Sequence, residues 1–588
     1  MVAPPPGRFT LGRCAVLLLA ALCVSALATC SLYPPKDAVR GADGLAQVEA
    51  EYGIHPLDPA SGTPLIKQAL EEVEKTDPFR YFRGRTYRLT AGNRLPQDWL
   101  LQTPNVWGKR GADVPFFPLE CEGCDPDFRL PVCSANTQCG PGKCLPLAAT
   151  VKKRGEAAAK MCVGHSDAVL DRFYRLIVSA QSAVDIALLQ PPPDTRFAAT
   201  LRNAITFLAN ERRAVTIRVI IGDHPPEGTD PAAFARELVR DADIPGSRLD
   251  IFVGAIRSCS GEPSCGALSW NHAKIVAVDG RRAIVGGHNM WSPDYLTAAP
   301  VHDVSMEVDG PAATDAHRFL DELWDFLCEQ TPNEHVNEWH GALGGATESG
   351  TECPSRISLP AHPASRNGGV PILAVGRLAA GIAPVFADQS LIARDLMLGA
   401  ATKSVRMLVQ DVPFAVAGVN LSWPEHALNA LAGLLAKGGD VYIVLSNLGA
   451  EGPVGDYSMK VPIETVAMKM RDKLHARTSL DDAALTDLLC RHLHLAPLRF
   501  GPDGTWPDDK PIGMHSKFWM VDTRAFYVGS ENLYPSELQE FGYIVEDGKA
   551  AAQALHELWE PAWRWSQAAA ISGEEASACV FQQKTTKR

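Results

Sequence analysis

Two stretches of this 588-residue chain repeat one pattern. Residues 271–279 read NHAKIVAVD, and residues 514–522 read MHSKFWMVD. Each is followed six residues later by a second match, GGHN at 286–289 and GSEN at 529–532. Both copies fit the spacing H-x-K-x4-D-x6-G-[GS]-x-N, with five identical positions and one shared small residue. Chance does not produce such a match at one spacing, so we expect two similar halves.

The segments around the two motifs alternate between helical and strand patterns. Runs such as TIRVII at 216–221 are apolar and β-branched, as is typical of buried parallel strands. We therefore predict an α/β fold of two similar αβα-sandwich lobes, related by a pseudo-twofold axis, with the active site at their interface. The expected elements are helices at 168–180, 197–213 and 424–437, and strands at 182–189, 215–222, 405–409 and 440–445.

The first residues resemble an export signal. A short apolar run from Cys14 to Ala28 follows basic residues, which is typical of a secretory leader and too short to span a bilayer comfortably. Its end fits either a small-residue cleavage site at Ala28 or a lipoprotein-type site at Cys30, so the exported chain is secreted, periplasmic or anchored by lipid. The expected divisions are a signal at 1–30, a tether at 31–60, lobe 1 at 61–340, a linker at 341–370 and lobe 2 at 371–580.

A cysteine-rich insertion interrupts the first lobe at about 117–164. An exported chain and a Gly/Pro-rich context favour disulfides there, although the C-x-x-C at its start is also compatible with a zinc knuckle. The chain has 15 cysteines; without the three in the first 30 residues an even number is left. The cysteines of the insertion are Cys121, Cys124, Cys133, Cys139, Cys144 and Cys162.

The charge of the chain argues against one class of partner. The formal net charge is −12, and an acidic chain is a poor nucleic-acid binder because phosphate neutralisation drives that binding. We therefore expect no nucleic-acid partner. Both motifs lie in one chain, so we also expect a monomer.

Each motif is expected to form a strand, a tight turn and a second strand. Residues two apart on a strand share a face, so His272 lies beside Lys274, and His515 beside Lys517. Asp279 and Asp522 are an odd number of positions from the histidines, so we expect them to point away and to anchor the turn or an ion pair. The small pairs Gly286-Gly287 and Gly529-Ser530 are assigned to turn formation.

Combined across the lobe interface, the motifs supply two imidazoles, two ammonium groups and the amides of Asn289 and Asn532. This set suits one phosphodiester, which needs a nucleophile on one side and a proton donor for the leaving oxygen on the other. The lysines and asparagines would stabilise the negative charge. Ammonium groups repel cations, so we expect neither a metal nor a cofactor.

The motifs resemble those of the phospholipase D superfamily in its two-motif form, and the chain is most similar to its secreted bacterial enzymes. The likeness covers about residues 60 to 580; the cysteine-rich insertion departs from it. The other stretches that carry it are DWLLQTP at 98–104, SWNH at 269–272, FYVGS at 526–530, FGYIVE at 541–546 and residues 563–567.

The resemblance implies roles for particular residues. His272 would be the nucleophile, and His515 the general acid and then the base. A carboxylate further along each half would hold the second ring nitrogen of its own half's histidine, Asp303 for His272 and Glu540 for His515. Trp291, Tyr295 and Tyr457 would surround a choline head group through cation–π contacts.

The implied reaction is hydrolysis of a phosphatidylcholine-type diester at a membrane or micelle surface to phosphatidate and a free alcohol, with transphosphatidylation. A phosphatidyltransferase of the cardiolipin-synthase type would share both motifs, although that group usually carries membrane segments. A phospholipase D-like nuclease would want a basic groove, and a non-catalytic lipid-binding protein would not need two complete motifs.

Overall fold

The computed structural model describes residues 52–108, 134–135, 143–146, 160–163, 166–193, 196–224, 228–259, 269–297, 299–330, 336–341, 345–346, 352–359, 369–379, 381–382, 388–416 and 420–582. The expected leader at 1–30, Cys30 and most of the tether lie outside these residues. Of the cysteine-rich insertion, only Cys144 and Cys162 are on described strands, where they pair in register. These strands are β3 (Lys143–Pro146) and β4 (Lys160–Val163).

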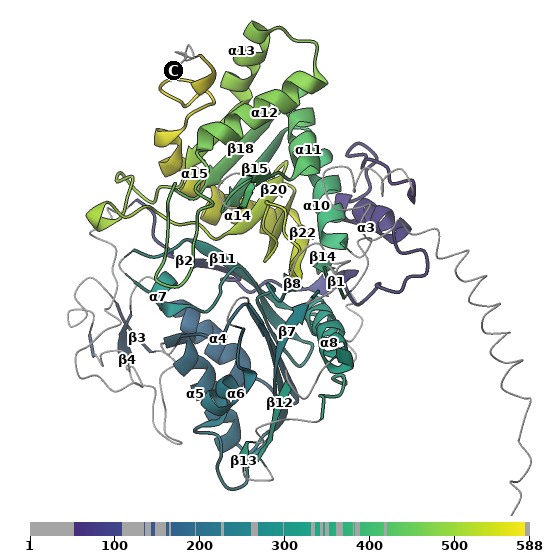
Figure 1. Cartoon of the computed structure of the whole chain (residues 1–588), viewed down its shortest axis with the longest axis vertical. Helices are drawn as coiled ribbons and strands as arrows, with labels where there is room; N and C mark the ends of the chain where they lie inside the picture. Colours follow the sequence, from purple (N-terminus) through teal and green to yellow (C-terminus); the bar gives the residue numbers. More distant parts are fainter. Residues whose placement is uncertain are drawn as a thin grey trace, which may run out of the picture.

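Two mixed sheets form the core of the α/β fold (Figure 1). The first has the order β13-β12-β7-β6-β5-β9-β10-β11-β2, with β8 paired to β7. Helices cover both of its faces, α4, α5 and α6 on one side and α8 on the other. Its strands are β2 (Leu100–Thr103), β5 (Ala183–Leu188), β6 (Ala214–Gly222), β7 (Arg248–Ser258), β8 (Ser269–Trp270), β9 (Ile275–Val278), β10 (Arg282–Gly286), β11 (Asp303–Asp309), β12 (Val336–His340) and β13 (Gly345–Ala346), and its helices are α4 (Ala168–Val178), α5 (Arg196–Asn210), α6 (Pro231–Val239) and α8 (Ala312–Gln330).

The second sheet has the order β1-β14-β22-β21-β20-β15-β18-β19. Helices α10 and α11 lie on one side of it, and α14 and α15 on the other (Figure 1). Its strands are β1 (Tyr87–Asn93), β14 (Val370–Arg377), β15 (Ser404–Val409), β18 (Asp440–Leu445), β19 (Leu493–Pro497), β20 (Lys517–Val521), β21 (Ala525–Gly529) and β22 (Glu540–Glu546). The helices of this half are α10 (Gln389–Gly399), α11 (Glu425–Ala436), α12 (Ile463–Arg477), α13 (Asp482–His492), α14 (Gly548–Ala554) and α15 (Glu560–Ser566).

The strand order recurs between the sheets. The run β7-β6-β5-β9-β10-β11 matches β19-β18-β15-β20-β21-β22, and in each run the first three strands are parallel and the rest antiparallel. Each motif forms the hairpin of the fourth and fifth strands, as predicted. A pseudo-twofold axis between the halves stays a prediction.

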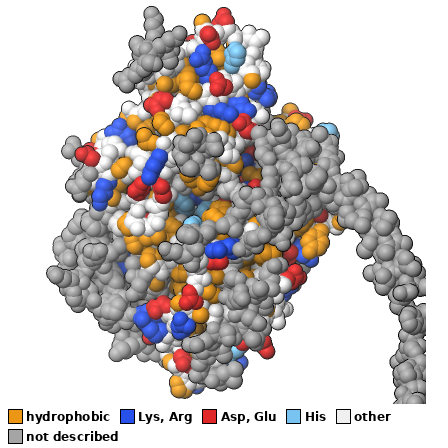
Figure 2. Space-filling model, in the orientation of Figure 1, with side chains coloured by type: hydrophobic (Ala, Val, Ile, Leu, Met, Phe, Trp, Pro, Cys, Tyr) orange, Lys and Arg blue, Asp and Glu red, His pale blue; other side chains and the backbone are white. Residues whose placement is uncertain are grey.

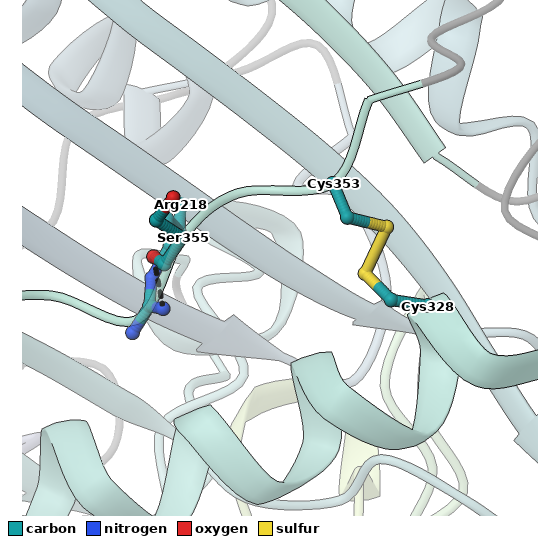
Figure 3. The surroundings of a disulfide bond; sticks show 4 residues. All are labelled: Arg218, Cys328, Cys353 and Ser355. Atoms are coloured by element: carbon teal, nitrogen blue, oxygen red, sulfur yellow. Dashed lines mark hydrogen bonds between the residues drawn. A yellow bond between two sulfur atoms is a disulfide. The ribbon is translucent and has the colours of Figure 1, made fainter.

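The expected lobe boundaries need two corrections. Helix α3 (Leu65–Lys75) contacts β22, and β1 joins the second sheet, so the segment from 61 contributes to both lobes. The expected linker at 341–370 is not loose throughout: Cys353 forms a disulfide with Cys328 at the end of α8, and Arg218 donates to the carbonyl of Ser355 at 3.3 Å (Figure 3). The Gly/Pro/Ser-rich composition of this stretch did not indicate the disulfide or the hydrogen bond to Arg218.

The two lobes share one hydrophobic core, and α8 is the element between them. It contacts β7 and β9 of the first sheet and β14 of the second. Phe319 of α8 is fully buried, with its ring centroid 5.1 Å from that of Phe541 on β22. Burial of such side chains on both sheets at once fixes the lobes against each other. Within the described residues no helix combines the length and the apolar character needed to cross a bilayer.

The aspartates of the motifs close the sheets at the hairpin turns. Asp279 has a φ of +52° and accepts four hydrogen bonds, at 2.8–2.9 Å, from the backbone and side chain at the start of β5. Asp522 has a φ of +50° and makes the same kind of bonds to Thr402, Lys403 and Ser404. Both aspartates therefore point away from the histidines and hold backbone, as expected.

We expect Asp279→Ala to lower the free energy of unfolding by ~2–4 kcal/mol, because buried backbone donors lose a charged acceptor. Asp279→Asn keeps an acceptor and tolerates the left-handed backbone, so it should cost less than half as much. Denaturant unfolding measures both variants. Equal, small losses would show that the turn is held by the hairpin alone.

Candidate active site

His272 lies just before β9 and is held by the second lobe. Its backbone N–H donates to the carbonyl of Gln539 at 2.9 Å, and Asn271 forms a bridge with the same residue. The ring Nδ1 is 3.0 Å from both carboxylate oxygens of Glu540, the first residue of β22. The imidazole is therefore oriented by main-chain and side-chain contacts from the opposite half.

His515, just before β20, is held by the first lobe in the same way. Its backbone N–H donates to the carbonyl of His302 at 2.7 Å, and its Nδ1 is 2.8 Å from Oδ2 of Asp303, the first residue of β11. Tyr295 donates its hydroxyl to the same Oδ2 at 2.8 Å. The His515 ring is thus fixed by a carboxylate that is itself fixed.

The expected pairing of carboxylates and histidines within each half is wrong. The structure crosses them: Glu540 holds His272, and Asp303 holds His515. The reason is the backbone pairing between lobes, because the residue before each carboxylate bonds to the segment that carries the other half's histidine. Each carboxylate is therefore the first residue of a strand that starts next to the histidine of the other motif.

The two imidazoles face each other in one cavity. Their ring centroids are 6.3 Å apart and the ring planes are inclined by 77°. Both rings border a cavity of about 960 Å³. Figure 2 shows histidine side chains in a hollow near the middle of this face, with hydrophobic side chains around it. Because each Nδ1 is bonded to a carboxylate, Nε2 is the nitrogen available for chemistry.

The lysines of both motifs are buried close to the histidines. Lys274 is 4% exposed and Lys517 is 1% exposed, and each ammonium donates to the backbone carbonyl of its motif's histidine. Burial lowers the pKa of Lys517 to about 7, against the opposing effect of Asp303 and Glu540. Burial and the like charge of Lys517 lower the pKa of Lys274 well below its usual value. Such a pair gains most from a bound anion.

The resting histidines are kept uncharged by their surroundings. Burial lowers the pKa of His272 to about 4, with Glu540 opposing and Lys274 adding to the effect. Burial and the two lysines lower the pKa of His515 well below its usual value. An anion that neutralises the lysines would let an imidazole take up a proton, as acid catalysis requires.

The asparagines of both motifs are buried as well. Asn289 and Asn532 follow β10 and β21, and they are 1% and 3% exposed. Among the described residues, Asn289 Oδ1 and both polar atoms of the Asn532 amide are buried without a hydrogen-bond partner. Buried polar atoms are normally paired, so these unpaired amide atoms favour a ligand-binding role, in which the N–H groups of Asn532 can donate to an anion.

The small residues of the two motifs do different work. A Cβ at Gly287 would lie 1.9 Å from Oδ1 of Asp303, so only glycine leaves room for that carboxylate. Ser530 at the matching position donates its hydroxyl to Glu540 at 2.5 Å. Gly286 and Gly529 end strands β10 and β21. The small residue at this position therefore accommodates the carboxylate in both halves. Gly287 leaves room for Asp303, and Ser530 donates a hydrogen bond to Glu540.

The three expected head-group aromatics separate into two roles. Trp291 and Tyr457 border the cavity, whereas Tyr295 does not border it and is fully buried behind Asp303. Burial and the Asp303 charge raise the pKa of Tyr295 well above its usual value, so it stays a hydrogen-bond donor. The prediction that Tyr295 contributes to a choline cage is therefore wrong. Its hydroxyl instead donates a hydrogen bond to Asp303.

Asp294, which lies in α7 (Ser292–Tyr295), was not among the predicted site residues. Its carboxylate accepts from the backbone N–H groups of Val454 and Gly455, at 3.0 and 2.9 Å, and from the hydroxyl of Tyr457. Asp294 therefore ties the first lobe to the loop of the second that borders the cavity. Asp294 lies five residues beyond the asparagine of the motif, as Glu537 does in the second half, so the repeated motif itself does not include it.

The chain is similar to a known protein over most of its length. Phospholipase D from Streptomyces antibioticus is 30% identical over 554 residues, which covers 87% of this chain and 89% of that protein. The chain belongs to the phospholipase D family. Cardiolipin synthase A from Pseudomonas entomophila is 32% identical over 97 residues, 16% of this chain and 19% of that protein. A scan against protein-family models gave no match.

Two solved structures resemble this chain in part. Phosphatidylserine synthase from Haemophilus influenzae has a TM-score of 0.45 at 15% identity, covering 68% of this chain and 84% of that one. Nuc from Salmonella typhimurium, a phospholipase D family member, has a TM-score of 0.18 at 16% identity, covering 30% of this chain and 87% of that one. Among the described residues no group of three His, Cys, Asp or Glu side chains is arranged to hold a metal ion.

The crossed pairing predicts which residues are energetically coupled. In double-mutant cycles measured by denaturant unfolding, Asp303→Asn with His515→Gln should give a coupling energy of ~1–3 kcal/mol. Glu540→Gln with His272→Gln should do the same. The pairs within one half, Asp303 with His272 and Glu540 with His515, serve as controls and should couple less strongly. Stronger coupling within the halves would contradict the crossed arrangement.

Proposed function

We propose that this chain is a phospholipase D that hydrolyses phosphatidylcholine-type diesters to phosphatidate and a free alcohol. The observation that carries the proposal is the pair of carboxylate-held imidazoles facing each other across one cavity, with ring centroids 6.3 Å apart. The family likeness over most of the chain supports the diesterase class. The choice of lipid and head group goes beyond that likeness and rests on the cavity walls.

The proposed reaction has two displacements at phosphorus. Nε2 of His272 attacks, and the bond to the leaving alcohol breaks as Nε2 of His515 gives that oxygen a proton. His515 then takes a proton from water, whose oxygen attacks phosphorus and releases His272. Lys274 and Lys517 balance the charge of the phosphoryl oxygens in both steps. No residue in this scheme needs a metal ion.

The walls of the cavity support a lipid substrate with a cationic head group. Apolar side chains such as Leu391, Phe414 and Trp423 border it, together with the rings of Trp291 and Tyr457. Apolar walls suit acyl chains, and indole or phenol faces attract a quaternary ammonium. The disulfides Cys328–Cys353 and Cys490–Cys579 support a site of action outside the reducing cytoplasm.

Ethanol tests the covalent intermediate. If His272 carries the phosphatidyl group after the first alcohol has left, a small alcohol can replace water as the second acceptor. Added ethanol should divert product from phosphatidate to phosphatidylethanol while choline release continues, and two inversions should retain the configuration at phosphorus. Product analysis and chiral phosphorothioate substrates measure both.

Controls separate the chemistry from folding. His272→Ala should lower hydrolysis and transfer together, by ~10²–10⁴-fold. His556→Ala, at an exposed histidine paired with Glu560, should lower neither. Choline release without any phosphatidylethanol, or inversion at phosphorus, would indicate direct attack by water. No release of head group from any phosphatidyl lipid would reject the lipid substrate.

A further inference from the structure

The two catalytic pairs come from one repeated motif, yet Arg377 gives them different surroundings. Strands β14 and β22 are antiparallel, and Arg377 lies directly opposite Glu540 in their register. Residues so placed share one face of the sheet. The guanidinium Nη2 is 3.6 Å from Oε1 of Glu540. The side chain is 2% exposed and borders the cavity.

The matching position in the first half carries no charge. Strand β2 pairs with β11 as β14 pairs with β22, and the residue opposite Asp303 is Thr103. The Thr103 hydroxyl is 2.8 Å from Nε2 of His288. Among the described residues, the ion pair that Asp303 makes is with His515, and no lysine or arginine nitrogen lies within 4.0 Å of its carboxylate. The carboxylate that holds His515 therefore lacks the cation that Glu540 has.

Arg377 is held in place and stays charged. Its Nε donates to the carbonyl of Leu538 at 3.1 Å, and its Nη2 donates to Ser536 Oγ at 3.1 Å. Burial alone would lower its pKa, but the carboxylates of Glu531 and Glu540 raise it above the usual arginine value. The same carboxylates neutralise most of the positive charge of Arg377, so it would attract a substrate anion only weakly. An effect on Glu540 therefore fits better than a role in phosphate binding.

We propose that Arg377 is a positioning residue that weakens, through Glu540, the hold of His272 on a proton, and so makes His272 the attacking histidine. The inference rests on the proposed reaction at this site. A carboxylate beside a fixed cation stabilises an imidazolium less than a carboxylate without one. Attack needs the lone pair of Nε2, whereas the acid must keep its proton until the alcohol leaves.

Other influences reach both histidines but are not identical. A hydroxyl donates to each carboxylate, Tyr295 to Asp303 and Ser530 to Glu540, and His288 adds to the lowering of the His515 pKa. Burial and the two motif lysines lower the proton affinity of both rings, and a phosphate anion between the lysines offsets that effect for both. A buried arginine directly opposite the carboxylate is present for one ring alone, because Arg377 lies opposite Glu540 and Thr103 lies opposite Asp303. The two copies of the motif contain the same histidine, lysine and aspartate. The cross-strand neighbours differ in charge, because one is an arginine and the other a threonine.

The pH dependence of a water-soluble diester tests this role without a lipid. With bis(p-nitrophenyl) phosphate the leaving group needs little protonation, so the acid limb of kcat/KM reports the loss of the proton from His272. Arg377→Gln removes the cation, strengthens the hold of Glu540 and should move that limb to higher pH by at least ~0.5 unit. Below the limb the rate should fall ~3-fold or more, and it should recover as the pH rises.

Two matched variants complete the experiment. Arg377→Lys keeps a charge near Glu540 and should return the limb toward its wild-type position. Arg202→Gln removes a buried arginine that pairs with Glu237 and Asp241 away from the cavity, and its acid limb should stay in place. If thermal unfolding shows that Arg377→Gln does not fold, Arg377→Met removes the charge without leaving polar atoms to satisfy.

A loss of rate that is equal at every pH, with the limb unmoved, would overturn the proposal and leave Arg377 a structural residue. A limb that moves to lower pH would also overturn it. The result is separable from the lipid assignment. If the wild-type enzyme cleaves bis(p-nitrophenyl) phosphate but no phosphatidyl ester, the proposed lipid function is wrong. The shift of the acid limb in the Arg377→Gln variant would still test the role of Arg377.

Discussion

The orientation of both imidazoles depends on hydrogen bonds that cross from one lobe to the other. Each imidazole has its Nδ1 held by a carboxylate of the opposite half, and its backbone N–H held by the residue just before that carboxylate. Neither lobe alone can orient either histidine. The shared core around α8 therefore has a chemical consequence, because it fixes the register that brings Asp303 under His515 and Glu540 under His272.

The same crossing concentrates charge in a buried place. Two lysines and two carboxylates lie around the rings, all of them nearly or fully inaccessible to solvent. Burial lowers the pKa of both lysines and both histidines, so the site without an anion holds fewer protons than the same groups in water would. A phosphodiester supplies the missing negative charge. In the proposed reaction, binding the anion between the lysines would also make an imidazolium possible, so binding and activation would be coupled electrostatically.

Much of this could be predicted from the sequence. The repeated motif identified both histidines, both lysines and the hairpins, and the odd spacing of Asp279 and Asp522 correctly placed them away from the site. The strand β6 was found from its apolar run because helices cover both faces of its sheet. Such features depend on local periodicity, which a single chain displays directly.

The rest depends on contacts between distant segments. Which carboxylate serves which histidine follows from backbone pairing between lobes, and no spacing within one half encodes it. Tyr295 was expected in the head-group pocket because it is aromatic, but the short helix α7 turns it toward Asp303. Arg377 matches Thr103 only by its position in the sheet, so comparison of the two motifs could not find it.

The central claim is that two crossed pairs act as one site with His272 as the nucleophile, and trapping the intermediate tests it most directly. A phosphatidyl substrate would be mixed with the enzyme and quenched in acid within one turnover, and the modified histidine would be located by mass spectrometry of the peptides. The account predicts modification at Nε2 of His272 and none in an otherwise folded His272→Ala variant. Modification of His515, or product formed in a single turnover with neither histidine modified, would contradict it.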